Sequence, residues 1–211
     1  MIQLIWVINR MKQADPRQIK SKEKLHDAYL KLLFKGQEQF TIQKLCEIAN
    51  VTRPTFYKIY KDIQELRLDI HKAVLDDLKE ALTIKKQILT TEFTQNFIPE
   101  NLTLLFQHIQ LKHIVYETFF IYQPDGTFIK EVKEIIKDFI EEGILLSQSQ
   151  GKLLPVNLKL LIKYLTGAYV ESIIFWIEEN YETPIEEMAK SLIEMSLHGS
   201  YIPNSLQRSE K

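Results

Sequence analysis

The 211-residue sequence contains little cysteine, glycine or proline. Its single cysteine, Cys46, excludes an intrachain disulfide and fits a reducing compartment. Only six glycines and seven prolines occur, and most apolar residues lie in long unbroken segments, which favours an all-α fold. The longest apolar run near the start, "LIWVI" at residues 4–8, is too short to cross a bilayer or to form the core of a signal peptide. We therefore expect a cytoplasmic protein without a membrane partner.

The sequence also lacks the usual signatures of catalytic and metal sites. It contains no glycine-rich phosphate loop, no nucleophile elbow and no clustered acid pair. His113 and Glu117 are four residues apart and share a helix face, but no third ligand lies near them in the sequence. We expect no enzymatic activity, no metal and no cofactor.

The net charge of −1 hides an uneven distribution along the chain. Residues 1–62 carry 12 Lys and Arg against 6 Asp and Glu, whereas residues 63–211 carry 15 against 22. A basic segment next to an acidic one indicates that the first part meets a polyanion. Chance clustering of solvated lysines is the alternative explanation of the charge alone.

Apolar periodicity predicts helices along most of the chain. Ser21 is expected to cap a first helix that ends at Gly36, and Thr41 to cap a second whose inward residues include Ile48. A capping box at Asp62 and Glu65 starts a fourth helix that is expected to reach residue 88. Further helices are expected over residues 99–110, 111–122, 127–142, 156–179 and 184–198, with a turn at 123–126 and a loop at 141–155.

The segment "NVTRPTFYKIYKD", residues 50–62, has the features of a turn followed by a short helix. Asn50 tolerates the left-handed conformation that a tight turn requires. Pro54 fits the first helical turn, where its missing N–H does no harm. Thr52 supplies a capping oxygen, although the position before a proline also makes Arg53 a candidate cap. Together with the preceding helices, this pattern predicts a helix-turn-helix.

Helical spacing divides the residues of this short helix between two faces. Phe56 and Tyr60 are four residues apart and are expected to pack inward. The outward residues are donor-rich: Arg reads guanine edges, Thr contacts thymine methyls or phosphates, and Tyr and Lys bind phosphates. We expect the outward set to be Arg53, Thr55, Tyr57, Lys58 and Lys61.

The segment "FTIQKLCEIANVTRPTFYKIYKDIQEL" resembles the DNA-binding segment of TetR-family regulators. The matching positions are Thr41, Ile48-Ala49, Val51-Thr52, Phe56-Tyr57 and Tyr60. Three positions depart from the family pattern, because Asn50 replaces the usual Gly, Ile59 the usual His, and Ile63 the usual Lys. The resemblance implies DNA contacts from the helix-turn-helix and from a basic arm that precedes it. The implied set is Lys22, Lys24, Thr41, Lys44, Thr52, Arg53, Pro54, Thr55, Tyr57, Lys58 and Lys61.

The C-terminal half resembles a TetR subgroup that includes regulators of dihydroxyacetone kinase operons. In this family the last two helices form a four-helix dimer interface, which here implies Tyr164, Gly167, Glu171, Ile174, Met188, Leu192 and Met195. The middle helices carry many aromatic residues, which form either a plain core or, by the resemblance, an effector pocket. The implied pocket residues are Phe97, Phe106, His113, Tyr116, Phe120 and Tyr169.

These features predict an all-α protein with a three-helix helix-turn-helix domain at 16–62 and a helical effector-binding and dimerisation domain at 63–202. Residues 1–15 and 203–211 are expected to be tails, and Met11 is an alternative start. The predicted function is that of a homodimeric repressor released from a palindromic DNA operator by a small molecule. The alternative is a DNA-binding adaptor controlled by a partner protein on the C-terminal domain.

Overall fold

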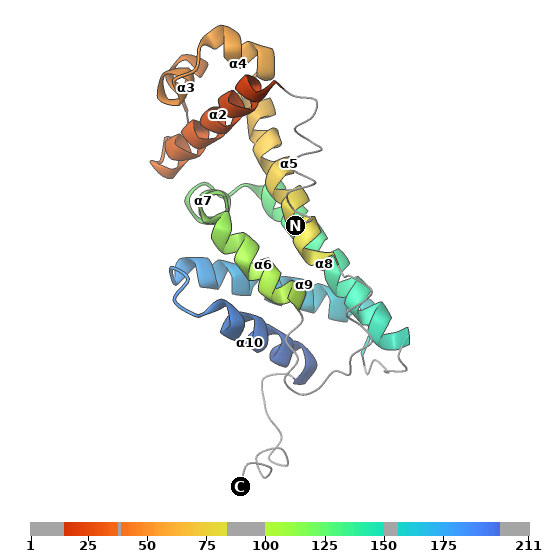
Figure 1. The fold of residues 1–211 in the computed structure, drawn as a ribbon. Helices are drawn as coiled ribbons and strands as arrows, with labels where there is room; N and C mark the ends of the chain where they lie inside the picture. The colour runs from red at the N-terminus through yellow and green to blue at the C-terminus, as the bar shows by residue number, and fades with distance from the viewer. Residues whose placement is uncertain (1–14, 38, 84–99, 150–155, 199–211) are drawn as a thin grey trace. The chain divides into compact units, whose positions relative to one another are not determined.

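The computed structural model describes residues 15–37, 39–83, 100–149 and 156–198, and the ordered secondary structure within these ranges is entirely helical (Figure 1). The prediction of an all-α fold is confirmed. The expected tails, the alternative start and Phe97 lie outside the described residues. The elements are α2 (Pro16–Phe34), α3 (Ile42–Ala49), α4 (Arg53–Ile59), α5 (Ile63–Leu82), α6 (Glu100–Leu111), α7 (His113–Tyr116), the π-helix η2 (Glu117–Tyr122), α8 (Gly126–Ser149), α9 (Leu158–Glu178) and α10 (Ile185–His198).

The chain divides into two compact units. The first holds α2, α3, α4, the part of α5 up to Val74, and residues 122–124. The second holds the rest of α5 from Leu75, with α6 to α10. The division therefore falls inside one continuous helix, whereas the sequence places the domain boundary at the start of that helix.

In the first unit, α2 packs against α3 and α4 around a small apolar core (Figure 1). The largest fully buried side chains here are Leu25, Leu45, Phe56 and Leu66. Asn50 ends α3 at φ 50° and ψ 50°, the left-handed turn that the sequence predicts. These contacts fix α3 and α4 as the two short helices of a helix-turn-helix.

Two details of this unit differ from expectation. The first helix begins at Pro16, because Asp15 accepts a hydrogen bond from the Arg17 N–H at 2.9 Å and Pro16 suits the first helical position. The Ser21 hydroxyl instead donates to the Arg17 carbonyl. Ile48, which was expected to face inward, is 41% exposed, whereas Leu45, Cys46 and Ala49 of the same helix are buried. In a helix of only eight residues, the spacing of apolar residues does not distinguish the edge of the buried face from its centre.

In the second unit, α8 packs on α9, and α10 packs on both α6 and α9. Trp176 of α9 is fully buried, with its ring centroid 5.1 Å from that of Phe106 on α6. Its indole N–H donates to the Thr183 carbonyl at 2.7 Å, which ties the end of α9 to the start of α10. A second aromatic group, built from Tyr116, Phe119, Phe120 and Phe128, joins η2 to α8.

Helix α8 continues to Ser149, so the loop predicted from residue 141 is wrong over 141–149. Gly143 lies inside the helix, because one glycine lowers helix stability by only about 1 kcal/mol and does not end a helix by itself. Helix α5 ends at Leu82 within the described residues, and the Thr83 hydroxyl donates to the Lys79 carbonyl just beyond that end. Residues 84–88 of the helix expected there lie outside the described residues.

The helix expected over 111–122 is present but changes character within its length. It is α-helical over His113–Tyr116 and a π-helix over Glu117–Tyr122. The backbone N–H of Asp125 donates to the Phe119 carbonyl at 2.9 Å, and the Asp125 carboxylate caps α8 through the N–H groups of Thr127 and Phe128. Asp125, within the predicted turn at 123–126, thus satisfies backbone groups at the end of η2 and at the start of α8.

Candidate nucleic-acid interface

Helix α4, the second short helix of the helix-turn-helix, begins at a clear cap. The Thr52 hydroxyl accepts a hydrogen bond from the Thr55 N–H at 3.3 Å, and it lies 2.8 Å from the Thr55 hydroxyl. Thr52, and not Arg53, is therefore the cap that the sequence left open. Pro54 lies in the first turn, where no helical hydrogen bond is lost.

The two faces of α4 separate as the spacing predicts. Phe56 is fully buried and Tyr60, directly after the helix, is 3% exposed. Arg53, Lys58 and Lys61 are exposed, and Tyr57 is 52% exposed. Helix α4 thus presents Arg53, Tyr57 and Lys58 to solvent, and Lys61 is exposed just after it.

The N-terminal end of helix α3, in the same unit as α4, is also exposed. The Thr41 hydroxyl caps it by accepting from the Lys44 N–H at 3.2 Å, and both residues are exposed. Exposed backbone N–H groups at a helix start, together with a Lys, attract phosphate.

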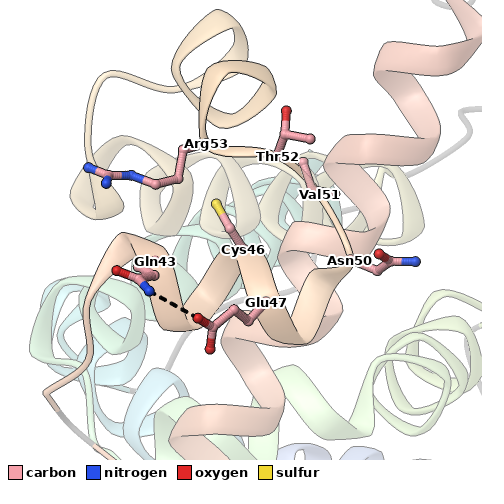
Figure 2. Close-up of a pocket in the computed structure, with 7 residues that line it drawn as sticks. All are labelled: Gln43, Cys46, Glu47, Asn50, Val51, Thr52 and Arg53. Carbon is pink, nitrogen blue, oxygen red and sulfur yellow. Dashed lines mark hydrogen bonds between the residues drawn. The ribbon is translucent and has the colours of Figure 1, made fainter.

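An open pocket of about 290 Å³ lies between α3 and α4 (Figure 2). Its lining is Gln43, Cys46, Glu47, Asn50, Val51, Thr52 and Arg53. Figure 2 shows the Gln43 amide joined to the Glu47 carboxylate, a bond of 3.1 Å, while the Arg53 side chain extends away from Asn50. Sequence patterning did not single out Gln43 and Glu47 as part of this surface. Their only sequence signal is their position one turn apart on the polar side of α3.

The basic arm is only partly free. Lys24 is exposed, whereas the Lys22 ammonium lies 2.8 Å from one carboxylate oxygen of Asp69 on α5 and 3.1 Å from the other. Asp69 itself was not identified from the sequence. The ion pair holds Lys22 against its own unit.

The residues expected to line an effector pocket lie in two different settings. Phe106, Tyr116, Phe120 and Tyr169 are all buried. The imidazole of His113, by contrast, is half-exposed and lies 3.1 Å from the Glu117 carboxylate. Tyr116 and Phe120 are in ring contact, whereas Phe106 packs on Trp176.

The Tyr116 hydroxyl has a buried polar neighbour, His108. It lies 3.1 Å from the Nε2 atom of His108, which is 8% exposed. Burial lowers the pKa of His108 to about 4, although nearby Asp77 acts in the opposite direction. His108 is therefore neutral at pH 7.

The residues expected at a dimer interface divide between surface and core. Tyr164, Glu171 and Met195 are exposed, and Gly167 and Ile174 are partly exposed. Met188 and Leu192, by contrast, are buried within the second unit.

The exposed side of α9 also carries two apolar residues outside the predicted set. Leu160 is 66% exposed and Phe175 is 53% exposed. Helix α9 is long and apolar enough to meet the length and composition criterion for crossing a membrane, and core helices of soluble proteins meet it too. Of its most apolar window, 44% is buried inside the protein.

Within the described ranges, no three His, Cys, Asp or Glu side chains gather as a metal site would require. His108 and His113, the two histidines of the middle helices, are engaged with Tyr116 and Glu117 respectively.

Residues 96–198 match the family model TetR_C_8, described as a transcriptional regulator C-terminal region. No curated protein matches the chain. Among solved structures, the fatty acid degradation regulator FadR from Bacillus halodurans is 13% identical, with a TM-score of 0.67 over 91% of this chain and 100% of that one. FadR from Bacillus subtilis, solved in complex with stearoyl-CoA, is 16% identical, with a TM-score of 0.61 over 85% and 99%.

The dihydroxyacetone kinase operon activator DhaS is also 16% identical, with a TM-score of 0.58 over 84% of this chain and 94% of that one. At these identities the structural matches establish the fold, and the family model assigns the C-terminal region. The resemblance to TetR-family transcriptional regulators is thereby confirmed: residues 96–198 match a model of transcriptional regulator C-terminal regions, and the chain has the all-α fold of solved TetR-family regulators.

Proposed function

We propose that this chain is a cytoplasmic, sequence-specific DNA-binding regulator that binds a palindromic operator as a homodimer and is released by a small-molecule effector. The observation that carries the proposal is the division of α4. Phe56 and Tyr60 anchor it, while Arg53, Tyr57 and Lys58 are exposed together. Arg reads guanine in the major groove, and Tyr and Lys bind the flanking phosphates.

One copy of α4 has seven residues and reaches few base pairs. Two copies spaced about 34–36 Å apart read both halves of a palindrome over one turn of DNA. The exposed apolar residues of α9 support pairing of two chains, because Leu160, Tyr164 and Phe175 recur on one helical face with Gly167 between them. A Cβ added at Gly167 meets no atom within 4 Å in the single chain, so the backbone there is open to close approach by another helix.

The effector class we propose to test first is the long-chain acyl-CoA thioesters. FadR from Bacillus subtilis was solved with stearoyl-CoA and has the same fold. Release requires that the effector bind a DNA-incompetent geometry of the dimer more tightly than the DNA-competent one.

The proposal is tested by selecting DNA from a random-sequence pool with the wild-type protein and measuring affinity by gel shift. We expect Arg53→Ala to weaken discrimination at one position of each half-site by about 1–3 kcal/mol. We expect Lys61→Ala to lower the affinity for all DNA sequences alike and to reduce the slope of log K against log salt by about one per protomer. Lys133→Ala, which removes an exposed Lys of α8, is the charge-matched control and should change neither quantity.

If Arg53→Ala and Lys61→Ala both bind DNA as the wild type does, α4 is not the reading element. Addition of stearoyl-CoA to the wild-type complex tests the effector. Retention of the complex at saturating concentrations of several acyl-CoA chain lengths would remove this ligand class.

A second candidate function is activation through a partner protein bound to the C-terminal region. The neighbour DhaS, which is described as an operon activator, favours it. Operator binding that no small molecule changes, but that a protein partner does, would support this candidate over the first.

A further inference from the structure

Four side chains from three segments of the first unit converge on one point. They are Lys22 and His26 of α2, Tyr60 directly after α4, and Asp69 of α5. The Tyr60 hydroxyl donates to an oxygen of Asp69 at 2.6 Å. The Nε2 atom of His26 lies 3.0 Å from the same carboxylate oxygen and 2.7 Å from the Tyr60 hydroxyl.

The geometry assigns the protons of this cluster. The carboxylate of Asp69 only accepts hydrogen bonds, and the Tyr60 proton is already donated to it. Both neighbours of the His26 Nε2 atom are therefore acceptors, so this nitrogen must carry a proton and donate. Lys22 adds a charged donor at 2.8 Å from Asp69, and its ammonium lies 5.6 Å from the centre of the Tyr60 ring.

The ionisation states of the two acidic groups agree with this assignment. Burial alone would raise the pKa of Asp69, but the hydrogen bonds from His26, Lys22 and Tyr60 together hold it well below its ordinary value. Burial and the bond to Asp69 raise the pKa of the Tyr60 hydroxyl far above its ordinary value. Asp69 thus stays a carboxylate, and Tyr60 stays a donor, throughout the neutral range.

The cluster lies where α4 needs a second attachment. Seven residues are too few for a helix to be stable alone, so the orientation of α4 depends on its contacts. Phe56 is one of these contacts, and its ring is buried among apolar side chains. The buried ring resists sliding of α4, but by itself it does not prevent α4 from rotating about the Phe56 side chain. Tyr60 is the other, and its hydroxyl is directionally bonded to residues of α2 and α5.

We propose that Asp69 is a positioning residue that fixes the C-terminal end of the recognition helix through Tyr60 and His26, and thereby sets how α4 meets the bases. Lys22 belongs to this cluster and not to the set of phosphate ligands. The inference rests on the proposed DNA-binding function, because it concerns how accurately that function is performed. Asp69 and His26 lie outside the DNA-contact set predicted from the sequence, and both act through another residue.

The test compares the ratio of specific to non-specific DNA affinity in three variants. Tyr60→Phe removes only the hydroxyl, and Asp69→Asn keeps the shape of the side chain but removes its charge. Val74→Ala is the control: it opens a small cavity beside α5 and removes no side-chain hydrogen bond. The probes are the duplex selected by the wild-type protein and a scrambled duplex of equal length, with all measurements made well below each melting temperature. Hydrogen exchange of the α4 amides is followed in parallel.

We expect Tyr60→Phe and Asp69→Asn each to reduce the specificity ratio about tenfold, and the double variant to lose little more than either alone. Exchange of the α4 amides should accelerate in both variants. Val74→Ala should lower the melting temperature without changing the ratio, which separates positioning from stability.

Lys22→Ala provides a second measurement on the same cluster. It should leave the salt slope of non-specific binding unchanged, because a Lys paired with Asp69 displaces no DNA counterion. A salt slope reduced by about one per protomer would return Lys22 to the phosphate ligands.

An unchanged specificity ratio in Tyr60→Phe and Asp69→Asn, with the wild type still selecting a DNA sequence, would overturn the positioning role and leave the proposed function intact. A wild-type protein that selects no sequence from the pool overturns both.

Discussion

His108 is a polar residue whose neighbours explain its protonation state. Its imidazole is buried against Tyr116, and the neighbouring Lys112 forms an ion pair of 3.0 Å with Asp77. Burial removes the water that an imidazolium needs, so the folded protein holds the neutral ring down to a pH of about 4. His108 is thus an uncharged hydrogen-bonding partner of Tyr116.

The depressed pKa of His108 predicts a loss of stability in acid. Because the unfolded chain takes up this proton near pH 6.5 and the folded chain only near pH 4, the stabilising contribution is complete above pH 6.5 and is lost as the pH falls between these values. The expected loss is about 3 kcal/mol in the free energy of unfolding. Urea unfolding followed by circular dichroism from pH 7 to pH 4 measures it.

His108→Asn is the control, because an amide does not titrate in this range. Its unfolding free energy should fall less steeply over the same interval. A wild type and a variant with the same pH dependence would show that His108 contributes no proton linkage.

Single positions also show what sequence reasoning resolves and what it does not. Asn50 and Thr52 were predictable because each position requires a local backbone geometry that few residues tolerate. The role of Asp69 was not predictable, because it depends on partners 43 and 47 positions away in the chain. The sequence does not show which residues so far apart lie close together in the fold. Local chemistry is visible in a sequence, whereas convergence of separate helices is not.

At the scale of the helices, α8 shows that a single glycine does not reliably mark the end of a helix. Gly143 suggested an end to the helix, yet α8 continues to Ser149. A Cβ built at Gly143 meets no atom within 4 Å, and its backbone does not have positive φ. Tertiary packing of α8 on α9 overrides the weak local preference.

This geometry predicts that Gly143→Ala stabilises the protein. Alanine lowers the entropy of the unfolded chain and enters open space in the folded one, so the gain should be about 0.4–1 kcal/mol. Thermal and urea unfolding measure it. Gly36→Ala is the contrasting variant, because Gly36 has φ +72° and a side chain there is strained; it should destabilise. Destabilisation by Gly143→Ala would mean that the helix meets a neighbour at this point.

At the scale of the whole molecule, the outer face of α9 is the surface through which we propose that two chains pair. Tyr164 and Leu160 are about two-thirds exposed one turn apart, and Phe175 continues the same face. Large apolar side chains in such a row are costly to leave in water and mark a surface that another protein covers. A second copy of this chain offers the same surface and satisfies a two-fold interface.

We expect Leu160→Glu to yield a monomer. A glutamate in the first turn of α9 favours the helix itself, so its effect should fall on association and not on folding. Sedimentation equilibrium measures the mass, and operator affinity should drop with it because one α4 no longer has its partner. Leu111→Glu, at a position that is 78% exposed on α6, is the matched control and should leave the mass unchanged. A dimer that persists in Leu160→Glu would place the interface elsewhere.

The burial of Trp176 and Cys46 gives each unit its own built-in reporter. Trp176 is enclosed between Phe106 and Tyr181 in the second unit, so its fluorescence should shift to longer wavelength when that unit opens. Cys46, the chain's only thiol, lies in the core of the first unit, where burial raises its pKa. Its reaction with a thiol reagent should therefore be slow in the folded unit and accelerate when α3 and α4 separate. Measured together on a Trp6→Phe variant, in which Trp176 is the one remaining tryptophan, the two signals can show whether the first unit loosens before, with or after the second.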